Sequence, residues 1–346
     1  MLQPQKRIET FDILKGMAII LVIIGHAHGL SVPIKSSAYY MLNEVIYSFH
    51  MPLFFLISGY FFKQMDLKNC LKKNFSRLVI PYIFTCLVII IIAAGISFFQ
   101  NANVVASIYD WSIASLFGSG SWSGSGLFAD TKSIGALWFL LSLFWGLLFF
   151  TIIFNYKDKL PLIISSIILL LVGIITAKFI RLPLSIQSGM VSVIFIYIGY
   201  YAKTYGLLNR KYNPFVLFTM LIIWIVDIKW GSMDMPGAYL KTVFLEVLGS
   251  VCGAYFMYKI ANVISTKTKM TKNIFLFFGV STLSVLCFHN IELMLSNWNK
   301  LYFYVSNDYL FIIARLIIEI AFATIMVFVV KRISFLNKIF TGKFLE

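Results

Sequence analysis

GMAIILVIIGHAHGL, residues 16–30, is apolar over most of its length and carries His26 and His28 near its far end. Together with the residues before it, this stretch reaches the roughly 20 residues that a helix needs to cross a bilayer. Similar apolar runs recur along the 346-residue chain, in which 60% of the residues are hydrophobic and 12% are charged. Because soluble domains have about 25% charged residues, we expect an all-α, polytopic integral membrane protein. Residues 1–346 should form a single transmembrane domain with no separate soluble domain.

The alternation of apolar runs with charged breaks predicts about ten transmembrane helices. They cover residues 13–30, 44–62, 79–99, 136–154, 161–177, 186–202, 214–228, 241–260, 274–292 and 309–330. If the first helix starts in the cytoplasm, 21 of the 29 Lys and Arg residues fall in inner segments. The positive-inside rule then places both termini in the cytoplasm, and we expect the membrane to be the bacterial inner membrane. The net charge of +15 follows this distribution, so it indicates topology rather than nucleic-acid binding.

The longest predicted outer loop, about residues 100–135, contains GSGSWSGSG at 118–126. Gly and Ser are typical of a flexible linker, whereas Trp122 leaves a sugar-stacking lid as the alternative. Both interpretations predict a loop at this position.

Several predicted helices carry ionisable side chains that lie at a similar depth, in the outer half of the membrane, if each residue advances the helix by about 1.5 Å. Such groups are costly in a membrane and mark functional sites by default. The residues of this layer are His26, His50, Glu246, His289, Arg315 and Glu319. Arg315 and Glu319 are four residues apart, so they can pair on one helix face. An interfacial side chain that reaches water remains the alternative for each of them, and it is the simpler interpretation for Glu44, Asp227, Lys241 and Glu292.

The histidines do not have the spacing of a metal-binding motif. No HxH pair can share an ion on a helix, because His26 and His28 point about 200° apart around the axis. HExxH is absent from the sequence, and HExxH is the motif that places two zinc ligands on one helix face. We therefore predict no metal.

The segment KQMDLKNCLKKNFSRLVIPY, residues 63–82, has five basic residues and one Asp. Clustered Lys and Arg near a helix start can bind a phosphorylated ligand, although simple topogenic charge explains them equally well. Together with the polar layer in the outer half, the cluster suggests a large anionic ligand held from the cytoplasm and chemistry deeper in the membrane.

Five segments resemble the membrane acyltransferase 3 family, most closely its sugar O-acetylases of the fucose 4-O-acetylase type. They are FDILKGMAIILVIIGH (11–26), SFHMPLFFLISGYFF (48–62), KKNFSRLVIPY (72–82), ALWFLLSLFW (136–145) and, more weakly, FHNIELML (288–295). The first helix of the family has a basic residue, ten residues and then His, which are Lys15 and His26 here. Eleven residues are about three helical turns, so both side chains lie on one face about 16 Å apart. Many members have Arg where this chain has Lys15, and Lys lacks the planar fork with which Arg binds phosphate.

The resemblance implies an acyl-CoA-dependent O-acetyltransferase that moves an acetyl group from cytoplasmic acetyl-CoA to a hydroxyl of a cell-surface glycan or its lipid-linked precursor. The CoA phosphates would be bound by Lys15, Lys72, Lys73 and Arg77. A desolvated imidazole tends to be neutral and can accept a proton, so His26 would act as general base or as acyl carrier, with His50 beside it. Substrate or oxyanion candidates are Ser58, Trp138, Glu246, His289, Arg315 and Glu319. Membrane lipids are the other expected partner, no cofactor is expected to stay bound, and the oligomeric state is open.

A transporter or flippase that exports a polysaccharide intermediate is the main alternative, because buried charges also relay protons in carriers. Against it, the sequence has no duplicated halves and no matching pair of Gly/Pro-broken helices of the kind that inverted repeats leave. A purely structural membrane protein would not explain the alignment of Lys15 with His26.

Overall fold

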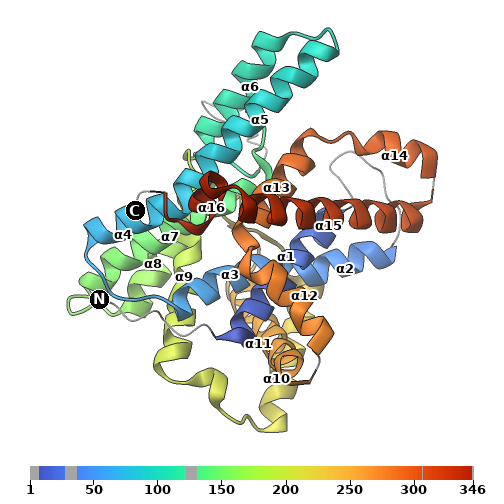
Figure 1. Cartoon of the computed structure of the whole chain (residues 1–346). Coiled ribbons are helices and arrows are strands. Elements are labelled where there is room, and N and C mark those ends of the chain that lie inside the picture. The colour runs from blue at the N-terminus through green and yellow to red at the C-terminus, as the bar shows by residue number, and fades with distance from the viewer. Residues whose placement is uncertain (1–7, 28–36, 122–130, 268, 306, 345–346) are drawn as a thin grey trace.

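The structure is a computed structural model that describes residues 8–27, 37–121, 131–267, 269–305 and 307–344 (Figure 1). These residues fold into α-helices, as the composition predicts, with one small exception. Strands β1 (Met233–Asp234) and β2 (Tyr239–Leu240) form an antiparallel hairpin in which Met233 lies opposite Leu240. Trp122 and residues 122–126 of GSGSWSGSG, like His28, lie outside the described residues.

The helices are named in chain order. They are α1 (Glu9–His26), α2 (Ser37–Tyr47), α3 (His50–Tyr60), α4 (Leu67–Asn74), α5 (Ile80–Phe99), α6 (Val104–Phe117), α7 (Trp138–Asn155), α8 (Leu162–Ala177), α9 (Ile186–Thr204), α10 (Pro214–Trp230), α11 (Phe244–Lys267), α12 (Lys269–Val280), α13 (Thr282–Leu295), α14 (Trp298–Val305), α15 (Asp308–Arg332) and α16 (Ser334–Thr341). A π-helical turn, η1 (Phe75–Val79), joins α4 to α5, and 3-10 turns form η2 (Gly135–Leu137) and η3 (Leu207–Asn209).

Length and composition support fewer membrane spans than the sequence pattern predicts. In the part of the chain that the structure describes, five helical segments are long and apolar enough to cross a membrane: Tyr39–Tyr60, Leu67–Phe99, Gly135–Asn155, Phe244–Thr266 and Asp308–Arg332. A sixth results if α12 and α13, which meet at an angle of 75°, are counted as one broken span. Each of the ten predicted ranges overlaps a helix. The difference arises because helices such as α8, with 16 residues, are short, while α1 contains Glu9, Asp12 and Lys15. Five or six spans fit a polytopic membrane protein.

Residues 104–117 are helical, so the expectation that the whole of 100–135 is a loop is wrong there. Helix α6 begins at a cap in which the side chain of Asn103 accepts a hydrogen bond from Ala106 N at 3.0 Å. It ends at Gly118, whose φ of +65° is the left-handed conformation that glycine adopts without strain. The hydroxyl of Tyr82 donates to Ser115 O at 2.5 Å, which ties α6 to α5. Figure 1 shows α5 and α6 side by side as a projecting hairpin.

Helix α1 lies in the core of the bundle, against α3, α11, α12 and α13. Its contact with α12 is a close backbone crossing between two glycines. A Cβ atom on Gly16 would collide with the carbonyl oxygen of Phe275, and one on Gly279 would collide with that of Asp12. Small residues allow helices in membranes to pack this closely. The crossing fixes α12 against the inner part of α1, and the bend after α12 then directs α13 toward the other end of α1.

Candidate functional site

Three cavities adjoin one another inside the bundle. The basic cavity, about 230 Å³, is lined by Lys63, Lys73 and Arg77 among others. The middle cavity, about 280 Å³, is lined by Lys15, Arg77 and a largely apolar wall. The histidine cavity, about 510 Å³, is lined by His26, His50 and Trp138 among others.

Shared lining residues connect the three spaces. The basic and middle cavities have Ser58, Arg77, Leu78 and Leu143 in common. The middle and histidine cavities have Val22, Met51 and Leu286 in common. The cavities therefore form a row that leads from the predicted inner basic segment to the predicted layer of ionisable groups.

Helix α1 contributes one ionisable side chain to each of two cavities of this row. Lys15 lines the middle cavity and His26 the histidine cavity, as their three-turn spacing predicts. Lys15 also forms an ion pair with Asp12 Oδ1 at 2.6 Å. Asp12 was not predicted as a partner of Lys15, although its position three residues before Lys15 is the spacing of a helical ion pair. This ion pair holds the Lys15 ammonium at the wall of the middle cavity.

The basic cavity is built by α4 and the π-helical turn that follows it. The side chain of Asp66 caps α4 by accepting a hydrogen bond from Asn69 N at 3.3 Å, and the hydrogen bonds from Asn69 lower the pKa of Asp66. The π turn adds a residue to the helical repeat, and Arg77 on this turn lines both the basic and the middle cavity. Both lysines are exposed, but Lys73 lines the basic cavity and Lys72 lines none of the three. The structure therefore groups Lys73 with Arg77 and leaves Lys72 apart.

His50 and Trp138 lie in the same cavity as His26, whereas Ser58 does not. His50 begins α3, is 4% exposed, and its Nδ1 lies 2.8 Å from the carbonyl oxygen of Ile46. A carbonyl only accepts, so Nδ1 donates and the lone pair of the neutral ring lies on Nε2. Ser58 lines the basic and middle cavities, and its hydroxyl donates to Phe54 O at 2.8 Å. This position does not suit an oxyanion role next to His26.

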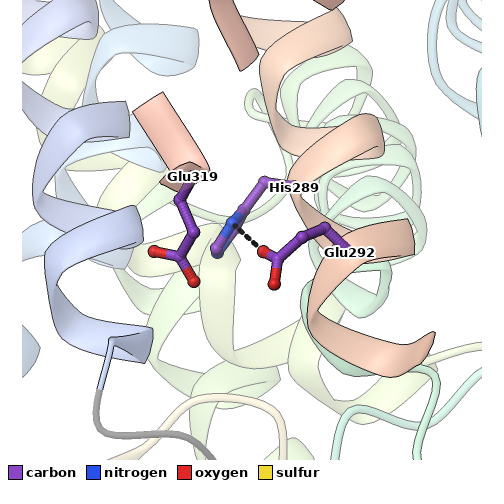
Figure 2. Close-up of side chains that lie close together, drawn as sticks. All are labelled: His289, Glu292 and Glu319. Atoms are coloured by element: carbon purple, nitrogen blue, oxygen red, sulfur yellow. Dashed lines mark ion pairs between the residues drawn. The ribbon is translucent and has the colours of Figure 1, made fainter. Parts of the chain in front are cut away.

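Behind His26 lies a buried group of charged side chains, which we call the acidic cluster: His289, Glu292, Arg315 and Glu319. His26 Nδ1 is 3.3 Å from His289 Nε2, and the two rings stack with centroids 5.5 Å apart. His289 Nδ1 lies 3.4 Å from Glu292 Oε2. Figure 2 shows the imidazole of His289 between the carboxylates of Glu292 and Glu319. Four residues of the predicted layer, His26, His289, Arg315 and Glu319, come together in the structure from α1, α13 and α15.

One carboxylate oxygen of each glutamate in the acidic cluster accepts a hydrogen bond from a neighbouring side chain. Arg315 Nε donates to Glu319 Oε1 at 2.7 Å, and Trp298 Nε1 donates to Glu292 Oε1 at 2.6 Å. The guanidinium of Arg315 also lies 4.7 Å from the centre of the Trp298 ring. Glu292 is therefore buried in the cluster rather than interfacial. The sequence signal that could have found it is its place three residues after His289, on the same helix face.

A ring nitrogen of His289 and one oxygen each of Glu292 and Glu319 lie within 4.8 Å of one another, the only such group of metal-type ligands among the residues described. The spacing rule that predicted no metal considers one helix at a time, and this group combines two helices. Imidazole and carboxylate are ligands that zinc accepts, so these three side chains are of a kind that could bind a metal.

Glu246 has a different role from the one expected. Its carboxylate accepts hydrogen bonds from Ser232 N at 3.1 Å, Thr242 N at 3.0 Å and the Thr242 hydroxyl at 3.0 Å. These contacts fix the chain on either side of the β1–β2 hairpin, and Glu246 lines none of the three cavities. The carboxylate of Glu246 therefore has a structural role in place of the predicted substrate role, because its hydrogen bonds go to Ser232 and Thr242, on either side of the hairpin.

Residues 8–332 match the family model described as an acyltransferase domain. Two proteins described as nodulation protein NolL are also similar. The one from Sinorhizobium fredii is 30% identical over 173 residues, which cover 48% of this chain and 42% of that protein. The one from Mesorhizobium japonicum is 26% identical over 167 residues, which cover 45% of this chain and 39% of that protein. The alignments thus span about two fifths of the length of these relatives.

No solved structure matches the chain. The match over residues 8–332 extends from the start of α1 to the end of α15 and includes every residue of the three cavities and the acidic cluster except those on α16 and the turn after it. The chain therefore belongs to the acyltransferase 3 family, which confirms the prediction of an acyltransferase domain.

Proposed function

We propose that the protein transfers an acetyl group from cytoplasmic acetyl-CoA to a hydroxyl of a cell-surface glycan or its lipid-linked precursor. The observation that carries this proposal is the row of adjoining cavities. It begins at Lys73 and Arg77 and leads to His26. A donor with a phosphorylated head and a thioester tail requires such an arrangement, with cations at one end and a base at the other.

The basic cavity suits the phosphates of CoA. Arg77 can bind a phosphate with two parallel hydrogen bonds, whereas Lys73 and Lys15 act as point charges. The largely apolar middle cavity suits the uncharged pantetheine arm. Lys15 and His26 are about 16 Å apart along α1, so the arm would carry the thioester from the cations toward the imidazole.

His26 would act as general base. The acceptor hydroxyl gives its proton to His26 as its oxygen attacks the thioester carbonyl, the carbon–sulfur bond breaks, and the CoA thiolate then takes the proton. Transfer of the acetyl to His26 first, as a covalent carrier, is the second route. His50 and Trp138 line the same cavity and would orient the acceptor. Since two carboxylates lie behind His26, the base route has the better electrostatic support.

Export of a polysaccharide intermediate remains the second candidate, because a row of connected cavities would also serve a transporter. Transporters with inverted repeats have broken helices in matching positions of their two halves. Among the helices that the structure describes, α12 and α13 are the only pair that together are long and apolar enough to form a broken span. This asymmetry favours the enzyme.

The test uses the purified full chain in liposomes, acetyl-CoA labelled in its acetyl group, and a panel of methyl glycosides as acceptors. We expect label to be transferred to a glycoside by the wild type and not by His26→Ala. Transport of an intact glycan without consumption of acetyl-CoA, with His26→Ala as active as the wild type, would refute the proposal in favour of a transporter.

A further inference from the structure

With both carboxylates ionised, the acidic cluster has one more negative charge than it has permanent positive charges. Two carboxylates, those of Glu292 and Glu319, face one guanidinium, that of Arg315. No other Lys or Arg in the described part of the chain forms an ion pair with either carboxylate. All three side chains are at most 9% exposed. Because an uncompensated buried charge is costly, the cluster can stabilise one additional positive charge nearby.

The carboxylate oxygens without a hydrogen-bond partner lie close to His289. Each carboxylate has one oxygen bound by a donor outside the pair, Trp298 for Glu292 and Arg315 for Glu319. The other oxygens, Glu292 Oε2 and Glu319 Oε2, are buried and have no hydrogen-bond partner among the described residues. Glu292 Oε2 lies 3.4 Å from His289 Nδ1. One oxygen of each carboxylate lies within 4.8 Å of a ring nitrogen of His289, and in Figure 2 the His289 ring lies between the two carboxylates.

We propose that His289 is a positioning residue that couples His26 to the acidic cluster, so that the charge formed on His26 during acyl transfer is stabilised through His289 by Glu292 and Glu319. This inference rests on the proposed function. His289 Nδ1 lies 3.4 Å from Glu292 Oε2, and in the proposed coupling this nitrogen carries the hydrogen of the neutral ring, so His289 Nε2 accepts from His26 Nδ1–H. This arrangement selects the tautomer of His26 whose lone pair is on Nε2.

The proton then has a defined path. The acceptor hydroxyl transfers its proton to His26 Nε2 as its oxygen bonds to the acetyl carbon, and His26 becomes an imidazolium. Its Nδ1–H strengthens the hydrogen bond to His289 Nε2, and the net negative cluster stabilises the positive charge, as the carboxylate does in a Ser-His-Asp triad. When the carbon–sulfur bond breaks, the Nε2 proton passes to the CoA thiolate. The products are the acetyl ester and CoA, and both histidines return to their starting state.

A metal ion in the same place would have the opposite effect on His26. A dication bound to His289 Nδ1 would leave the hydrogen of that ring on Nε2, so His26 Nδ1 would accept and His26 Nε2 would carry a hydrogen. His26 would then lack a lone pair on Nε2. The cluster would also change from net negative to net positive and would disfavour an imidazolium beside it. We therefore expect added Zn²⁺ to inhibit transfer rather than to support it.

The test compares two substitutions of His289 in the full chain, with acetyl-CoA and the best methyl glycoside from the panel. His289→Gln keeps an acceptor for His26 Nδ1–H but cannot share the charge, so kcat should fall roughly tenfold. His289→Leu removes the acceptor as well, so kcat should fall by about 10³-fold. The KM for acetyl-CoA should stay within about twofold of the wild-type value in both, because the donor is bound elsewhere.

Two further variants separate positioning from stability. Glu292→Gln keeps the shape of the cluster but removes one negative charge, and its kcat should also fall roughly tenfold. Asp227→Asn changes another buried carboxylate, on α10 and outside the cluster, and should leave kcat unchanged. Melting temperatures in detergent show whether each variant folds.

If wild type transfers acetyl and His26→Ala does not, the proposed function stands independently of His289. A His289→Leu variant that keeps kcat within about threefold of wild type would then overturn the coupling alone. If kcat fell equally in the Gln and Leu variants, and in proportion to the fall in their melting temperatures, His289 would be only structural. That result would also overturn the coupling. Stimulation of the wild type by Zn²⁺ would overturn it in favour of a metal site.

Discussion

Substitution of the neighbouring residues Lys72 and Lys73 provides the sharpest test of the donor end of the row of cavities. Lys73 lines the basic cavity, whereas Lys72, which is equally exposed, lines no cavity of the row. The two residues share their charge and their helix. Only Lys73→Ala should therefore weaken the binding of acetyl-CoA.

The expected size of the effect follows from exposure and hydrogen-bonding geometry. Lys73 is exposed at the cavity mouth, so an ion pair with a phosphate should contribute about 1 kcal/mol, which is roughly fivefold in KM. Arg77 lines two cavities and can bind a phosphate with two hydrogen bonds, so Arg77→Ala should cost about 2 kcal/mol, or roughly thirtyfold. The losses need not add if both cations bind the same phosphate.

The assay measures the KM for acetyl-CoA in liposomes with saturating glycoside and repeats the measurement with acetyl-pantetheine, which lacks the nucleotide phosphates. With acetyl-pantetheine, the Lys73 and Arg77 variants should match the wild type, because the lost interaction is absent from that donor. A Lys72→Ala variant that raises the KM for acetyl-CoA as much as Lys73→Ala does would refute the assignment of the basic cavity. So would an equal rise in KM for both donors.

Three other predictions concern packing, the hairpin and topology. Gly16→Val should lower the melting temperature in detergent, because the valine side chain would collide with Phe275 O and overpacking costs about 1–3 kcal/mol. Gly95→Val is the matched control, because a Cβ atom there meets nothing within 4 Å. This variant should melt near the wild-type temperature. Glu246→Ala should also lower the melting temperature, by about 1–3 kcal/mol of unfolding free energy, because the hydrogen-bond donors of Ser232 and Thr242 lose their acceptor; an unchanged melting curve would contradict its structural role. Alkaline phosphatase fused after Glu346 should be inactive, because the positive-inside rule puts this end in the cytoplasm; an active fusion would reverse the predicted topology.

The grouping of the polar residues was partly predictable from the sequence. His26, His289, Arg315 and Glu319 were expected at one level because each is a fixed number of turns from a helix end, and the structure brings them together. Glu292 was missed because a carboxylate near a helix end fits the interface equally well. Lys72 and Lys73 are neighbours on α4, and which of them lines the basic cavity depends on how that helix packs in the bundle, for which the sequence has no reliable signal.

The bend between α12 and α13 and the helix α6 were not predicted for related reasons. Residues 274–292 are mostly apolar and have no charged side chain before Glu292 other than a protonated His289, and hydrophobicity alone does not show that Ser281 separates two helices at 75°. Residues 104–117 are too short to cross a membrane and lie next to a Gly/Ser-rich stretch, so they were included in the loop. In both cases, packing against neighbouring helices decides the structure, and a hydrophobicity pattern does not contain that information.

The junction between the middle and histidine cavities has a consequence for the energy supply of the cell. Val22, Met51 and Leu286 line this junction from three different helices, and all three side chains are hydrocarbon or thioether. Hydrophobic constrictions exclude hydrated ions because water leaves them readily, whereas an uncharged acyl arm is compatible with such a wall. If the acyl donor enters along the row of cavities as proposed, the protein would in this way admit it and still remain tight to protons. The transmembrane proton gradient would then survive each turnover.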